Sequence, residues 1–133
     1  MKLPGTYIVE ACTRPVDFGD EWPAWLETHC YLRLVDCAGR TVDSISFSQT
    51  IRPDFRDTHE DDAAADCRVL RQVSKDEWRA LREQARATCR TERFDLWRFN
   101  CCTCVADLAT TSLDVALPDN IRRANGGRGM RQR

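Results

Sequence analysis

Eight cysteines in 133 residues limit what this chain can fold into, because each must be a disulfide half, a metal ligand, a nucleophile or a small buried side chain. Their share, about 6%, is below that of small disulfide scaffolds, and the chain is long enough to bury a core unaided. Their only cluster is the segment FNCCTCV. We expect all but one to be reduced, small apolar core residues, as in a protein kept in a reducing compartment.

Charge and hydropathy exclude several classes of partner. The 20 Lys and Arg balance 21 Asp and Glu, so no electrostatic argument favours nucleic acid or an anionic membrane surface. No stretch approaches 18 apolar residues, which excludes a spanning helix, and the start MKLPGTYIVEAC lacks the apolar run of a signal peptide. We therefore expect a protein made in the cytoplasm that leaves the cell only through a dedicated secretion system.

The apolar pattern predicts one α+β domain with a small antiparallel sheet. β-branched and aromatic residues mark the strands, and a short turn at Ala38 and Gly39 joins the middle two as a hairpin. Ser74-Lys75-Asp76-Glu77 is a capping box, which predicts a helix from there to about residue 89. The expected strands are 6–12, 29–36, 41–48 and 67–73, a second helix follows Asn100, the domain covers 1–121, and 122–133 form a flexible basic tail.

The second predicted helix begins with a candidate nucleophile. Asn100 is a preferred N-cap residue, so Cys101 would lie in the first turn, where backbone N–H groups stabilise a thiolate. A cysteine so placed has a lowered pKa and is a competent nucleophile near neutral pH. Of the two histidines, His59 lies in the acidic segment 53–66, which we expect to be a solvated loop. His29 begins a hairpin strand, so Cys101 and His29 form the best nucleophile and base that the sequence offers.

A third group is expected to orient the imidazole of His29. If the hairpin turn centres near residues 37–38, residue 46 lies opposite residue 29, and moving the centre by up to one residue shifts the partner to 47 or 48. We choose Ser46, with Ser48 and Gln49 as alternatives. Asp43 is the more usual chemical type but lies nearer the turn.

These residues resemble the circularly permuted papain-like group, which includes permuted NlpC-like peptidases and lecithin–retinol acyltransferase-like proteins. In that group a histidine precedes an N-C-x-x-F/C-V motif that carries the nucleophile. This chain has a similar arrangement: His29 in THCYLRLVD precedes Cys101 in NCCTCV, with Val105 on the helix. The resemblance covers about residues 25–115 and implies a half-barrel of antiparallel strands packed on the helix of the nucleophile. It also implies attack on an amide, ester or thioester carbonyl. Many members carry a second histidine or an acid on the next strand, where this chain has serines.

Simpler interpretations exist for each residue of the cluster. Cys101 could be a small buried thiol and His29 an edge histidine, and we expect Cys102 and Cys104 to pack in the core. Zinc bound by the three clustered cysteines and a histidine is not expected, because adjacent cysteines at a helix start point in divergent directions. We expect neither a metal nor a cofactor.

The sequence thus predicts a cysteine hydrolase, an amidase or peptidase, in which Cys101 attacks, His29 moves the proton and Ser46 orients the ring. A free-standing papain-like domain without an export signal resembles bacterial effector toxins that cut peptidoglycan or host proteins. The expected partners are therefore a peptide or amide substrate and an immunity or inhibitor protein. The alternatives are an acyltransferase or thioesterase with the same dyad, or a non-enzymatic binding or inhibitor protein of the same fold.

Overall fold

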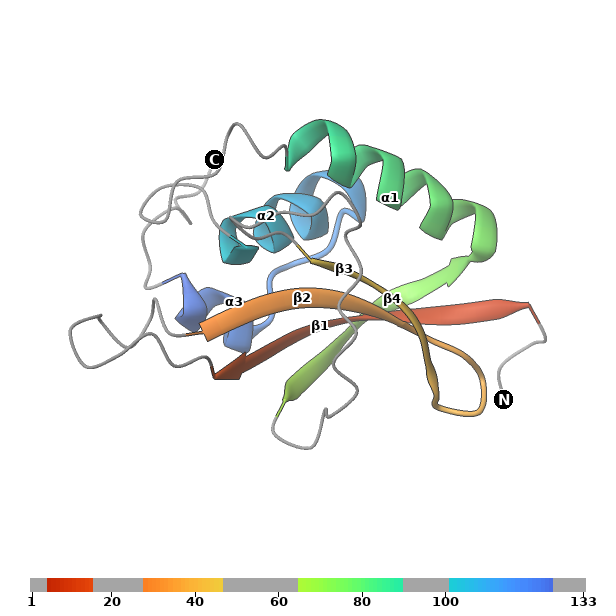
Figure 1. Ribbon diagram of the computed structural model, residues 1–133, viewed down its shortest axis with the longest axis horizontal. Helices are drawn as coiled ribbons and strands as arrows, with labels where there is room; N and C mark the ends of the chain where they lie inside the picture. The colour runs from red at the N-terminus through yellow and green to blue at the C-terminus, as the bar shows by residue number, and fades with distance from the viewer. Residues whose placement is uncertain (1–4, 16–27, 47–64, 90–100, 126–133) are drawn as a thin grey trace.

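Four antiparallel strands form the sheet against which the helices pack in a single α+β domain (Figure 1). The computed structural model describes residues 5–15, 28–46, 65–89 and 101–125. In chain order the elements are β1 (Thr6–Pro15), β2 (Thr28–Val35), β3 (Thr41–Ser46), β4 (Asp66–Ser74), α1 (Lys75–Thr88), α2 (Cys101–Asp107), the π-helical segment η4 (Leu108–Ser112) and α3 (Asp119–Ala124). The predicted α+β class and the antiparallel sheet of four strands are confirmed.

The strands lie in the order β3-β2-β1-β4, so β1 and β2 are central. The predicted hairpin joins β2 and β3, and its turn is held by the Asp36 carboxylate, which accepts hydrogen bonds from the backbone N–H groups of Ala38 and Arg40. Gly39 has φ +86° there, a left-handed conformation that glycine adopts without steric cost. Tyr31 pairs with Ser46 across this hairpin, which fixes its register.

Helix α1 begins as its capping box predicts. The Ser74 hydroxyl accepts a hydrogen bond from the Glu77 N–H at 3.1 Å, and the Glu77 carboxylate accepts one from the Ser74 N–H at 2.8 Å. Trp78, Leu81 and Ala85, which follow at helical spacing, form its buried face. Figure 1 shows α1 and α2 lying over the same side of the sheet.

The hydrophobic core lies between this side of the sheet and the helices. Alternate residues of β2 enter it, because successive strand side chains point to opposite faces. The second predicted helix is confirmed as α2, which continues into η4. The core includes Val9, Ala11, Cys30, Leu32, Leu34, Ile45, Val73, Trp78, Leu81, Val105, Leu108 and Ile121. Within the described residues, no helix combines the length and apolar character needed to cross a membrane.

The last helix extends past the predicted domain boundary at residue 121. Residues 122–124 belong to α3 rather than to a flexible tail, and Asn125, which caps this helix, is fully buried. Its side-chain amide donates hydrogen bonds to the carbonyl oxygens of Cys102 and Ile121, which ties α3 to α2. Residues 126–133 lie outside the described residues, as does most of the predicted loop at 53–66.

The expectation of a reduced core is wrong. Six of the eight cysteines form three disulfides, and the two free thiols are those of Cys37, which is exposed, and Cys101. Folding brings together cysteines that are far apart in the chain, and no local spacing reveals such pairs. The bonds join Cys12 to Cys67 between β1 and β4, Cys30 to Cys102 between β2 and α2, and Cys89 at the end of α1 to Cys104 in α2.

Candidate active site

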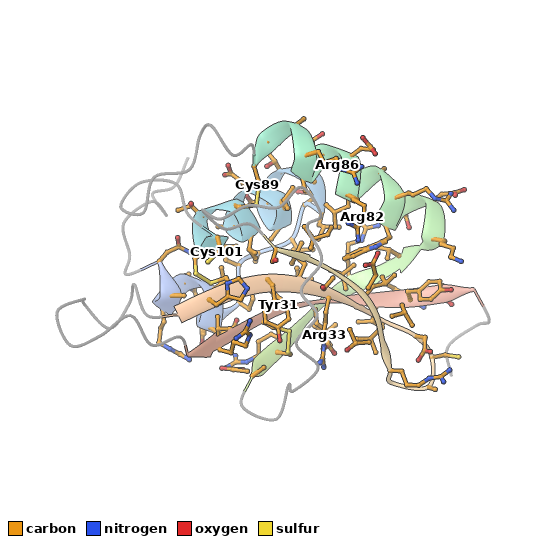
Figure 2. The ribbon with its side chains drawn as sticks, viewed as in Figure 1. Tyr31, Arg33, Arg82, Arg86, Cys89 and Cys101 are labelled. Carbon is orange, nitrogen blue, oxygen red and sulfur yellow. A yellow bond between two sulfur atoms is a disulfide. The ribbon has the colours of Figure 1, made fainter. Side chains whose placement is uncertain are left out.

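Cys101 is the first residue of α2, where the sequence predicts the nucleophile (Figure 2). The residue is half-buried, and its sulfur accepts a hydrogen bond of 3.4 Å from the backbone N–H of Cys30 in β2. Since the N–H groups of a strand lie in the plane of its sheet, this bond places the sulfur at the edge of β2 rather than over one face. Asn100, the predicted cap, lies outside the described residues.

The structure brings His29 to this sulfur. His29 is the second residue of β2 and precedes Cys30, whose backbone N–H contacts the sulfur, and its imidazole is close enough to lower the pKa of the Cys101 thiol. The predicted nucleophile and base, 72 positions apart in the chain, are therefore neighbours. The imidazole is also stacked on the ring of Tyr31, with ring centroids 5.6 Å apart and planes inclined by 22°. Tyr31 is almost completely buried, so this stack gives the imidazole a fixed support.

The surroundings of Cys101 favour its thiolate. Burial on its own would raise the pKa of the Cys101 thiol. The hydrogen bond and the positive charge of His29 act in the opposite direction, and so do the backbone N–H groups of Cys30 and of Cys101 itself. Together they lower the pKa of Cys101 below the ordinary value of a cysteine, which is the condition for nucleophilic reactivity near neutral pH.

The first choice of register for the orienting residue is wrong. Ser46 lies opposite Tyr31 and not opposite His29, which makes it a diagonal neighbour of His29 on the same face. Diagonal neighbours have backbones roughly 7–8 Å apart, which is still within reach of a ring as long as an imidazole. The observed register is the one that a one-residue shift of the turn centre predicts, and the alternatives Ser48 and Gln49 lie outside the described residues.

Asp43 lies away from this site and stabilises the packing of β3 against α1. It pairs with Leu34, five positions along β2 from His29, which corresponds to about 16 Å of strand. Its carboxylate accepts hydrogen bonds from Trp78 at 3.0 Å and from Arg82 at 2.5 Å, so it joins β3 to α1. These donors lower the pKa of Asp43 although its partial burial would raise it.

Sequence reasoning missed two features of the site, the Tyr31 support and a disulfide directly beside the dyad. The Cys102 sulfur, bonded to Cys30, lies 3.9 Å from the sulfur of Cys101. Cys101 and Cys104 have the C-x-x-C spacing typical of redox motifs, but the sulfur of Cys104 is bonded to Cys89. The zinc arrangement considered from the sequence would also need the sulfurs of Cys102 and Cys104, and both are engaged in disulfides.

Comparison with protein-family models, with curated proteins and with solved structures found no match. The chemistry of the site must therefore be inferred from its own geometry. A half-buried thiol with a lowered pKa, in contact with a supported imidazole, can attack an electrophilic carbon, and the same imidazole can return the proton. This combination is the minimum that covalent cysteine catalysis requires.

Proposed function

We propose that this protein is a cysteine hydrolase that cleaves amide bonds through an acyl-enzyme on Cys101. The observation that carries the proposal is that the half-buried sulfur of Cys101 lies 3.4 Å from the backbone nitrogen of Cys30, the residue after His29, where the imidazole helps to lower the pKa of the thiol. The resemblance to permuted papain-like proteins points to the same two residues.

In the acylation step, the Cys101 thiolate attacks the carbonyl carbon of the substrate and forms a carbon–sulfur bond. The protonated His29 then gives its proton to the leaving nitrogen, so that the carbon–nitrogen bond breaks and an amine departs. The oxygen of the tetrahedral intermediate carries the negative charge until this bond breaks. The backbone N–H of Cys101, which lies toward its own sulfur, is the candidate donor to that oxygen.

In the deacylation step, neutral His29 takes a proton from water as the water oxygen attacks the thioester. The carbon–sulfur bond breaks, a carboxylic acid leaves, and the thiolate and imidazolium are regenerated. Every proton is returned, so the cycle needs no cofactor. Ser46 remains the predicted orienting residue; Tyr31, which supports the ring directly, is the better-placed one.

Three disulfides favour a place of action in an oxidising compartment, because such bonds persist in secreted and periplasmic proteins. We infer that the chain is made in the cytoplasm and acts after delivery from it, as expected for an effector toxin. The amide substrate is then a peptide of peptidoglycan or of a host protein, and the producing cell would carry an immunity protein.

The first test of this proposal uses the two free thiols as a matched pair in one molecule. Iodoacetamide labelling, resolved by peptide mass spectrometry over a range of pH, gives the midpoint of reactivity for Cys101 and for the exposed Cys37 in the hairpin turn. We expect the midpoint of Cys101 to lie below about 8.5, the value of a free thiol, and His29→Ala to raise it. The reactivity of Cys37 should be unchanged in that variant.

The second test is hydrolysis itself. The oxidised protein is incubated with purified peptidoglycan and with unfolded protein substrates, and new amino termini are measured. We expect Cys101→Ala to abolish cleavage and His29→Ala to slow it by about 10²–10⁴-fold. A Cys101 that reacts like Cys37, or cleavage that survives Cys101→Ala, would refute the proposal. Transfer of the acyl group to an added amine or alcohol in preference to water would instead indicate the acyltransferase alternative.

A further inference from the structure

The halves of the dyad are each followed in the chain by one half of a disulfide. His29 precedes Cys30 in β2, Cys101 precedes Cys102 in α2, and Cys30 and Cys102 are bonded to each other. The Cα atoms of these two cysteines are 4.8 Å apart. One covalent bond therefore joins the strand that carries the base to the helix that carries the nucleophile, one residue away from both.

The contacts around this bond restrict the dyad further. Cys30 uses its side chain for the disulfide and its backbone N–H for the 3.4 Å hydrogen bond to the sulfur of Cys101. Cys102 places its own sulfur 3.9 Å from the same atom. Both cysteines are buried, at 0% and 3% exposure, so the bond lies in the core and its formation is tied to folding.

The other disulfide of α2 offers a contrast. Cys104 is also buried in this helix, but its disulfide joins α2 to Cys89 at the end of α1 and not to the strand of His29. Both disulfides stabilise the folded protein because they reduce the conformational entropy of the unfolded chain. Of the three disulfides, only the Cys30–Cys102 bond connects β2 to α2.

We propose that the Cys30–Cys102 disulfide is a positioning element of the active site, so that the dyad is assembled only where this bond can form. The proposal rests on the proposed function, because it concerns the regulation of the same site. In a chain folded in a reducing cytoplasm, only noncovalent packing would hold β2 against α2. The sulfur of Cys101 would then not stay within reach of His29. The hydrolase would then be inactive where it is made and active where it is delivered.

The chemistry of this switch is ordinary thiol–disulfide exchange. Forming the bond removes two protons and two electrons from the thiols of Cys30 and Cys102. The oxidant is a disulfide, either that of an oxidoreductase or that of oxidised glutathione, and it becomes two thiols. Reduction by a dithiol such as dithiothreitol runs the exchange backwards and leaves the dithiol as a cyclic disulfide.

The test removes each disulfide of α2 in turn from the full chain. Cys30→Ala/Cys102→Ala removes the proposed element, Cys30→Ala/Cys102→Val does so while filling more of the lost volume, and Cys89→Ala/Cys104→Ala is the matched control. Circular dichroism and disulfide mapping establish that each variant is folded with its other bonds intact. The pH midpoint of Cys101 alkylation is then measured with and without His29→Ala.

We expect loss of the Cys30–Cys102 bond to raise the midpoint by at least about one pH unit, which is about a tenfold fall in alkylation rate below both midpoints. In the variants without this bond, adding His29→Ala should raise the midpoint little further. In the Cys89→Ala/Cys104→Ala control, adding His29→Ala should raise the midpoint as it does in the wild type. The same midpoint and the same dependence on His29 in all backgrounds would overturn the proposal. So would an equal rise in the control, because that would indicate general loosening of α2.

A second measurement avoids the variants. The wild-type protein is refolded in glutathione mixtures of graded redox ratio, and mass spectrometry gives the fraction of each disulfide beside the alkylation rate of Cys101. The alkylation rate of Cys101 should follow the fraction of the Cys30–Cys102 bond and not the fraction of either other disulfide. A rate that follows another disulfide, or none of the three, would overturn the proposal. Failure of the proposed function looks different, because the low midpoint would then depend on this disulfide while no amide is cleaved.

Discussion

Asp43 is the carboxylate considered from the sequence as a residue that orients His29. In the structure it instead joins β3 to α1, and its contribution to stability can be measured. Its carboxylate accepts hydrogen bonds from the Trp78 indole and the Arg82 guanidinium, and it is only 23% exposed. Asp43→Asn keeps the shape of the side chain but removes the charge that Arg82 faces. We expect this variant to be less stable and to keep the reactivity of Cys101.

The size of the effect follows from these contacts. A hydrogen bond to a charged group contributes about 1.5–3 kcal/mol, so loss of the charge on Asp43 should lower the free energy of unfolding by about 2 kcal/mol. For 133 residues the entropy of unfolding near 60 °C is about 0.28 kcal/mol/K, which converts this loss into a fall in Tm of about 7 °C. Asp76→Asn is the control, because Asp76 and its partner Arg79 are exposed on α1, and such pairs contribute little.

The pH dependence separates the charge from other effects of the substitution. The donors around Asp43 lower its pKa in the folded protein although burial would raise it, so the charge stabilises the fold above the pKa of the unfolded chain. This stabilisation is lost as the pH falls through the lower, folded pKa. Calorimetry from pH 7 down to pH 3 should show the two Tm values converging at the acid end. An equal Tm at neutral pH, or a Cys101 midpoint that rises as in His29→Ala, would refute this assignment.

Two further substitutions test the cap of α1 and the support of the imidazole. Ser74→Ala should lower the free energy of unfolding by about 1 kcal/mol in denaturant titrations, because the Glu77 N–H loses its acceptor, while Lys75→Ala at the exposed neighbouring position should have little effect. Tyr31→Leu should slow alkylation of Cys101 by up to about tenfold and Tyr31→Phe should not, because an aromatic stack contributes about 0.5–1.5 kcal/mol and phenylalanine keeps it. Equal rates in the two variants would show that the ring stack does not hold His29.

The parts of the fold that were predicted correctly are those determined by interactions between residues close together in the sequence. The capping box at Ser74 requires only four consecutive residues, and the hairpin requires two alternating strands and a turn that contains Gly39. The approach of His29 to Cys101 was also predictable, since a strand start and a helix start are the positions from which two side chains can meet.

The parts predicted badly depend on contacts between distant residues. Cys30 and Cys102 are 72 positions apart, and before the sheet and α2 are placed nothing marks them as partners rather than as apolar core residues. The predicted hairpin register is wrong by two residues, since Ser46 pairs with Tyr31 and not with His29. The Asp36 turn and a bulge beside Leu34 lengthen the connection between the strands. Helix α3 was missed because Ile121 and Asn125 gain their burial only from tertiary packing.

The three disulfides close loops that overlap along the chain, from 12 to 67, from 30 to 102 and from 89 to 104. Every peptide bond between residues 12 and 104 therefore lies inside at least one closed loop. A protease that cuts once anywhere in this span produces two pieces that stay covalently attached, with His29 and Cys101 still on one molecule. A single proteolytic cut in this span would therefore leave one covalent unit instead of two separate fragments.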